Sequence, residues 1–109
     1  EANNNLGNVY KELGELDRAL NSYNDALAIN PDYPSLHNNL GNVYKEMGKL
    51  DDALNSYNNA LNYNPDYAET HNNIGLIFFE LKKLEKAIES YGDTDEISRR
   101  NIELLRKLV

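Results

Sequence analysis

The sequence contains no cysteine, so the chain folds without disulfide bonds. Its 109 residues suit one small domain or three units of a longer array, and packing alone must hold the core together. The absence of cysteine excludes cross-links but leaves the cellular compartment open.

Long hydrophobic stretches are also missing. No run of roughly 18 apolar residues occurs, so we expect no membrane-spanning helix and no membrane partner. The opening residues, Glu1-Ala2-Asn3, resemble neither a signal peptide nor an initiating start. We therefore expect a soluble, cytoplasmic segment cut from a longer protein.

Basic residues are scarce relative to acidic ones. The chain has 11 Lys and Arg against 18 Asp and Glu, which gives a net charge of −7. Nucleic-acid binding needs clustered Lys and Arg at the phosphates. The composition therefore argues against a nucleic-acid partner and favours a neutral or basic one.

What the sequence does contain is a repeat with a period of 34 residues. Residues 38–46 repeat residues 4–12 without change and recur in altered form at 72–80. Residues 1–33 and 35–67 are identical at 24 of 33 positions, which suits an engineered or recently duplicated sequence. Such a period is typical of stacked helical units rather than one globular core.

Each unit has the pattern of two amphipathic helices. Leu6, Val9 and Leu13 recur at helical spacing, and a second apolar series begins at Leu16. Gly14 separates the two series, and we expect it to adopt the positive φ angle of a tight turn. Each unit is therefore predicted to form an antiparallel helical hairpin.

Prolines and a lost glycine define the units. Pro31 disfavours helical geometry at the residue before it, and Pro34 fits the first turn of the next helix. Lys82 occupies the place of the turn glycine in the third copy, whose second helix we expect to be degenerate. The predicted organisation is unit 1 at 1–33, unit 2 at 34–67, unit 3 at 68–93 and a C-terminal capping helix at 94–109.

Small, apolar and aromatic residues recur at matching positions of the units. They are Leu6, Gly7, Tyr10, Gly14, Ala19, Tyr23, Ala26 and Pro31, then Leu40, Gly41, Tyr44, Gly48, Ala53, Tyr57, Ala60 and Pro65, then Ile74, Gly75, Phe78, Ala87 and Tyr91. This pattern resembles the signature of the tetratricopeptide repeat family. The resemblance implies an all-α, right-handed superhelical array of three antiparallel hairpins, with the first helices lining a concave, peptide-binding groove and no enzymatic activity.

Polar residues dominate the side of each first helix that lies opposite its apolar stripe. Because an asparagine amide both donates and accepts, a row formed by Asn5, Asn39 and Asn73 could bind the backbone of an extended ligand. The row resembles the asparagine ladder of O-GlcNAc transferases; the alternative is that these residues are solvated or link neighbouring repeats. The candidate peptide-binding residues are Asn4, Asn5, Asn8, Asn38, Asn39, Asn42, Lys45, Asn72, Asn73, Leu76 and Phe79.

A carboxylate clamp of the chaperone-cochaperone type is rejected. Its basic positions fall on Asn4, Glu69 and Asn73, so an acidic C-terminal peptide would meet no clamp and one repelling carboxylate. Leu76 and Phe79 replace the Asn and Lys of the first two units, so we expect them to contact an apolar ligand side chain or to be covered by the C-terminal helix.

No residue pattern supports catalysis, a cofactor or a metal. His37 and His71 are one repeat apart, which is too far to share an ion, and we expect them to pack at helix starts. We therefore predict a non-catalytic module that binds an extended peptide or protein segment. Two alternatives remain: a homo-oligomeric scaffold that stacks through an open N-terminal end, and the substrate-presenting arm of a larger enzyme such as a glycosyltransferase.

Overall fold

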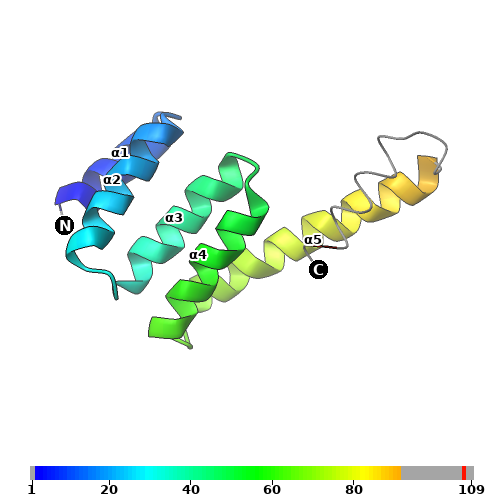
Figure 1. Ribbon diagram of the computed structural model, residues 1–109. Coiled ribbons are helices and arrows are strands. Elements are labelled where there is room, and N and C mark those ends of the chain that lie inside the picture. The colour runs from blue at the N-terminus through cyan, green and yellow to red at the C-terminus, as the bar shows by residue number, and fades with distance from the viewer. Residues whose placement is uncertain (1, 92–106, 108–109) are drawn as a thin grey trace. The chain divides into compact units, whose positions relative to one another are not determined.

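The computed structural model describes residues 2–91 and residue 107 of the chain (Figure 1). The described part is helical and contains no strand, which confirms the all-α prediction. The chain divides into two compact units, Glu1–Asn73 and Ile74–Val109, which are distinct from the predicted repeats. Below, "first unit" and "second unit" mean these two compact units. The helices are α1 (Ala2–Glu12), α2 (Leu16–Ile29), α3 (Pro34–Glu46), α4 (Leu50–Tyr63) and α5 (Ala68–Tyr91).

Glycine turns close the two hairpins of the first unit. Gly14 and Gly48 have φ angles of 77° and 78°, the left-handed conformation in which glycine meets no Cβ penalty. After each glycine the next amide returns to the preceding helix: Glu15 N–H bonds the Tyr10 carbonyl and Lys49 N–H the Tyr44 carbonyl, both at 2.9 Å. The predicted turns are confirmed, and α1 packs on α2 as α3 packs on α4.

The loop between hairpins is held by histidine. Nε2 of His37 lies 2.7 Å from the Pro31 carbonyl, and Nε2 of His71 lies 2.8 Å from the Pro65 carbonyl. Because a carbonyl only accepts, Nε2 carries the hydrogen in both rings. Each histidine therefore ties the start of a first helix to the loop before it.

The core of the first unit joins the first hairpin to α3. Ala19, Tyr23 and Ala26 from α2 cluster with Leu40 and Val43 from α3, and all are buried. The close approach needs glycine, since a Cβ atom on Gly7 would lie 2.6 Å from Cε1 of Tyr23. Small residues and a large ring thus interlock, as dense packing requires.

The third repeat, predicted at 68–93, differs from the expected hairpin. α5 runs unbroken for 24 residues, from Ala68 to Tyr91, through the position of Lys82 where a turn was predicted. No residue other than glycine has a positive φ angle in the described chain. Forcing Lys82 into the left-handed conformation would cost about 1–2 kcal/mol, so continuing the helix is favoured. Apart from residue 107, the predicted capping helix at 94–109 lies outside the described residues.

Among the residues that the structure describes, none of the helices combines the length and the apolar character needed to cross a bilayer.

Candidate functional site

The predicted binding residues of the first unit lie on α1, α3 and the start of α5. Asn5 and Asn72 are exposed, whereas Asn39 and Asn73 are partly buried. Asn38 has no exposed surface, so it cannot line a binding face, and that prediction is wrong. The helical wheel placed Asn38 opposite the apolar stripe of α3, but α3 is contacted by other helices on more than one side, so more than one arc is buried.

Two asparagine pairs link successive first helices. Asn39 Nδ2 donates to Asn4 Oδ1 at 3.2 Å, and Asn73 Nδ2 donates to Asn38 Oδ1 at 3.1 Å. The donor follows the acceptor by 35 residues in both pairs, so the link is a repeated feature. The interpretation that in-register asparagines connect neighbouring repeats is confirmed for these residues.

The second junction carries a larger polar network. Thr70 Oγ1 donates to Asn38 Oδ1 at 2.8 Å, and Asn73 Nδ2 also approaches Asn42 Oδ1 at 3.2 Å. Thr70 is fully buried and takes the position that Leu36 has in the preceding repeat. The two junctions are therefore chemically different, although the first two repeats are nearly identical in sequence.

A tyrosine hydroxyl fixes one asparagine in each hairpin. Tyr57 donates to Asn42 Oδ1 at 2.5 Å, and Tyr23 donates to Asn8 Oδ1. Desolvation by burial, followed by the carboxylates of Glu46 and Glu69, raises the pKa of Tyr57 to about 12.

The same causes act on the other tyrosine. Burial first, then the charges of Glu12 and Glu46, raise the pKa of Tyr23 to about 12. Both tyrosines thus remain neutral donors across the physiological pH range, and negative charge lies near the ends of α1 and α3.

Hydrogen-bonding capacity decides which amides could still hold a ligand. Asn39 uses one N–H group on Asn4 and keeps its other N–H and its carbonyl oxygen. Asn73 donates twice within the protein, which leaves mainly its carbonyl oxygen. Among the described residues no side-chain hydrogen bond involves Asn5, so its whole amide faces solvent.

The second unit contributes an apolar surface on α5. Leu76 and Phe79 are 51% and 57% exposed, and Nζ of Lys83 lies 4.9 Å from the Phe79 ring centroid. Lys83 also pairs with Glu80 at 3.7 Å, so its charge is balanced on the same helix. One repeat earlier, the position of Phe79 is occupied by Lys45 of α3, which is partly buried.

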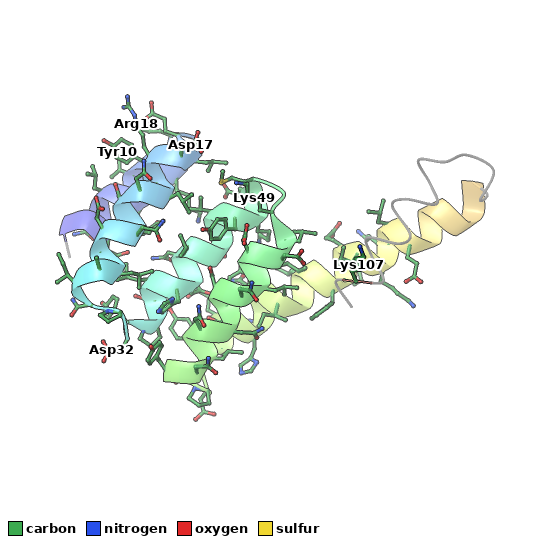
Figure 2. The ribbon with its side chains drawn as sticks, in the orientation of Figure 1. Tyr10, Asp17, Arg18, Asp32, Lys49 and Lys107 are labelled. Atoms are coloured by element: carbon green, nitrogen blue, oxygen red, sulfur yellow. The ribbon has the colours of Figure 1, made fainter. Side chains whose placement is uncertain are left out.

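Arg18 lies over the ring of Tyr10 near the turn that joins α1 to α2. The guanidinium of Arg18 lies 5.8 Å from the Tyr10 ring centroid and bridges to Glu15 at 3.6 Å. Figure 2 shows Tyr10 and Arg18 close together at the end of α1 and α2, with Asp17 beside them. This arrangement is exposed, so it contributes little binding energy on its own.

The sequence patterns missed the polar network around Asn38. Its partners lie 32 and 35 residues away, and only the packing of one repeat on the next brings them together. One signal was present: Thr70 stands where the preceding unit has Leu36, a polar residue at a buried position of the repeat.

Family models match most of the chain. A TPR repeat model matches residues 7–48 and 41–82, and a tetratricopeptide repeat model matches residues 68–101. No curated protein sequence matches the chain.

Several solved structures share the fold. The first TPR of Spaghetti (RPAP3), bound to the HSP90 peptide SRMEEVD, has a TM-score of 0.71 at 23% identity over 97% of this chain and 91% of that one. The Sgt2 TPR domain from Aspergillus fumigatus has a TM-score of 0.69 at 24% identity, with 97% and 76% of the two chains covered.

A tetratricopeptide repeat protein from Parabacteroides merdae is similar as well. It has a TM-score of 0.68 at 28% identity, and the match covers 97% of this chain and 44% of that protein. With its glycine-turned hairpins, its 34-residue period and the family models that match it, the chain belongs to the tetratricopeptide repeat family, whose fold is generally a non-catalytic module for protein interaction.

Proposed function

We propose that the chain binds an extended peptide or protein segment along the first helices of its repeats. The observation that carries this proposal is the in-register pair Asn5 and Asn39, one on α1 and one on α3, whose amides retain unused donors and acceptors at the surface. Asn73 adds a carbonyl oxygen in the same register.

The ligand would be recognised through its backbone. An extended strand advances about 3.3 Å per residue, and packed helices lie about 8–10 Å apart, so one amide contact falls at about every third ligand residue. Each amide pairs with a peptide N–H or C=O without reading the ligand side chain. Binding would therefore tolerate many ligand sequences.

The charge of this surface favours neutral or basic ligands. The carboxylates that raise the tyrosine pKa values, Glu12, Glu46 and Glu69, belong to α1, α3 and α5. The related structure of the first TPR of Spaghetti holds the acidic peptide SRMEEVD. This chain has Asn4, Glu69 and Asn73 where a carboxylate clamp needs basic residues, so we expect no binding of that peptide.

Leu76 and Phe79 form a separate apolar surface of α5 in this proposal. Their exposure leaves them able to pack against an apolar side chain of a protein partner. A substrate-presenting arm of a larger enzyme would use the same backbone contacts, so both versions make the same prediction for the asparagines.

Binding is tested with extended peptides and calorimetry. The variant Asn5→Ala/Asn39→Ala should weaken binding by about ten- to thirtyfold, since two hydrogen bonds of about 1 kcal/mol each are lost. The matched control is Asn24→Ala, which removes an exposed amide from α2.

Chemical changes in the peptide separate backbone from side-chain recognition. N-methylation of the ligand backbone should abolish binding, whereas scrambling the ligand sequence should leave most of it. Equal affinity of the double variant and the control would contradict the proposal, as would tight binding of SRMEEVD.

A further inference from the structure

A glycine and a tyrosine close each hairpin of the first unit. Gly7 and Gly41 are buried, and a Cβ atom on either would overlap the ring of Tyr23 or of Tyr57, respectively. In both hairpins the tyrosine follows the glycine by 16 residues and lies on the second helix. The contact is therefore a repeated feature of the fold, with a fixed spacing along the chain.

The third repeat keeps this pair but places it on one helix. Gly75 and Tyr91 are also 16 residues apart, and both belong to α5, which runs unbroken between them (Figure 1). Because an α-helix rises 1.5 Å per residue, the two positions are about 24 Å apart along the axis. Tyr91 therefore cannot reach Gly75 of the same helix, although a family model matches residues 68–101 as a repeat.

The surfaces that a hairpin covers are exposed on α5. Gly75 is exposed, and no described atom lies within 4 Å of a Cβ atom at that position. Phe78 and Leu84 are 40% and 47% exposed, whereas their equivalents Tyr44 and Leu16 in the earlier repeats are partly buried against the core. The first half of α5 thus has the face that receives a second helix, and the second half has the residues that dock on it.

Charge permits two such segments to meet. The whole chain carries a net charge of −7, so two copies repel each other over most of their surface. Residues 74–91 contain three Glu and three Lys, so this segment is neutral. Contact between two copies is opposed least here.

We propose that copies of the chain exchange the halves of α5. Residues 84–91 of one copy pack antiparallel on residues 74–82 of another, with Tyr91 of the first copy on Gly75 of the second. The sequence itself specifies this occupant, because the segment that covers the glycine in the first two repeats is retained in the third. The contact is one that the fold already makes within a chain, which is why exchange of an identical element is a low-cost route to association.

The direction of the two halves determines the type of assembly. At about 100° per residue, the position of Tyr91 lies about 160° around the helix axis from that of Gly75. A closed dimer would need both positions on one side of α5, since the same partner would have to meet both. Each copy therefore receives one neighbour and docks on a different one, and this head-to-tail contact lets the assembly grow beyond two copies.

Sedimentation of the 109-residue chain over a range of concentrations tests the exchange. The wild type should grow from monomer to species larger than a dimer. Gly75→Gln fills the receiving face and Tyr91→Ala removes the docking ring, so each should raise the dissociation constant at least tenfold. The matched control Glu80→Gln, an exposed position about 140° around α5 from Gly75, should assemble like the wild type. Circular dichroism establishes that each variant keeps its helices.

Mixing the two defective variants tests the pairing of Gly75 with Tyr91. The Gly75→Gln chain keeps an intact second half, and the Tyr91→Ala chain keeps an intact receiving face. An equimolar mixture should therefore form a one-to-one heterodimer that grows no further. Lys82→Gly permits a turn between the halves and should shift the chain towards monomers, because Tyr91 can then close on Gly75 of its own chain.

Three results would overturn the proposal. A wild type that stays monomeric at all concentrations would mean that the chain covers Gly75 itself or leaves it open. A wild-type assembly that stops at two copies would contradict the head-to-tail contact. A mixture of the two variants that does not associate would show that Tyr91 does not dock on Gly75.

Discussion

The Thr70 hydroxyl donates to the side-chain carbonyl of Asn38 at 2.8 Å, and neither residue has any exposed surface. The bond crosses the junction between the second repeat and the start of α5. At the preceding junction Leu36 stands in the place of Thr70, and a leucine at residue 70 would remove one of the two donors to the buried oxygen of Asn38.

Thr70→Val is expected to destabilise the chain by about 1–2 kcal/mol, because it keeps the shape of the side chain and removes one donor to a buried oxygen. Urea unfolding measures the loss. Thr70→Ser retains the hydroxyl and should lie closer to the wild type than the valine variant does. If the two variants are equally stable, the hydrogen bond contributes nothing.

Gly41→Ala should cost about 1–3 kcal/mol, since the added Cβ atom would overlap the buried ring of Tyr57 and force a shift of α3 or α4. Gly75→Ala is the matched control, because no described atom lies within 4 Å of a Cβ at that position. That control should gain about 0.5–1 kcal/mol from the better helix propensity of alanine. Thermal unfolding of both variants provides the comparison.

Gly48→Ala is expected to cost about 1–2 kcal/mol for a different reason. Its Cβ atom would meet no neighbour within 4 Å, but a φ angle of 78° is unfavourable for any side chain. The reverse exchange, Lys82→Gly, should weaken α5 around residue 82 by permitting the turn that ends α1 and α3. Amide hydrogen exchange along α5 would detect faster opening there, and unchanged protection would contradict this account.

Stability should fall as the pH rises from 10 to 12. The pKa values of Tyr23 and Tyr57 are raised in the fold from their ordinary value of 10.0 to about 12, mainly by burial. The neutral form is therefore favoured by folding, and this contribution is complete below pH 10 and is lost as the pH approaches 12. Urea unfolding at several alkaline pH values measures the decline.

Tyr57→Phe serves as the control for that decline. It should be less stable at neutral pH because Asn42 loses a hydrogen-bond donor, and its stability should fall less steeply above pH 10. An alkaline decline identical to that of the wild type would assign the effect to other groups.

Local chemistry explains how much of the fold the sequence predicts. The positive φ angles at Gly14 and Gly48, the start of α3 at Pro34 and the paired helices of the first two repeats all depend on residues within one turn of each other. The sequence did not predict α5 as one continuous helix. The choice between one helix and a hairpin depends on the balance between the strain of a turn at Lys82 and the packing of the second half of the repeat.

The candidate site was less predictable for a related reason. A helical wheel ranks residues by direction on an isolated helix, whereas Asn38 is buried by residues that follow it by 32 and 35 positions. The sequence pattern placed the polar surface on the first helix of each repeat. It could not distinguish the asparagines that link repeats from those, such as Asn5, whose amides make no hydrogen bond within the described part of the protein.

The asparagine links have a mechanical consequence for the stack of repeats. Asn39 to Asn4 and Asn73 to Asn38 join successive first helices along one edge, while the second helices α2 and α4 take no part in either bond. A bend that spreads the first helices stretches both links, and a bend that spreads the second helices stretches neither. The two links therefore oppose spreading of the successive first helices and do nothing to oppose spreading of α2 from α4.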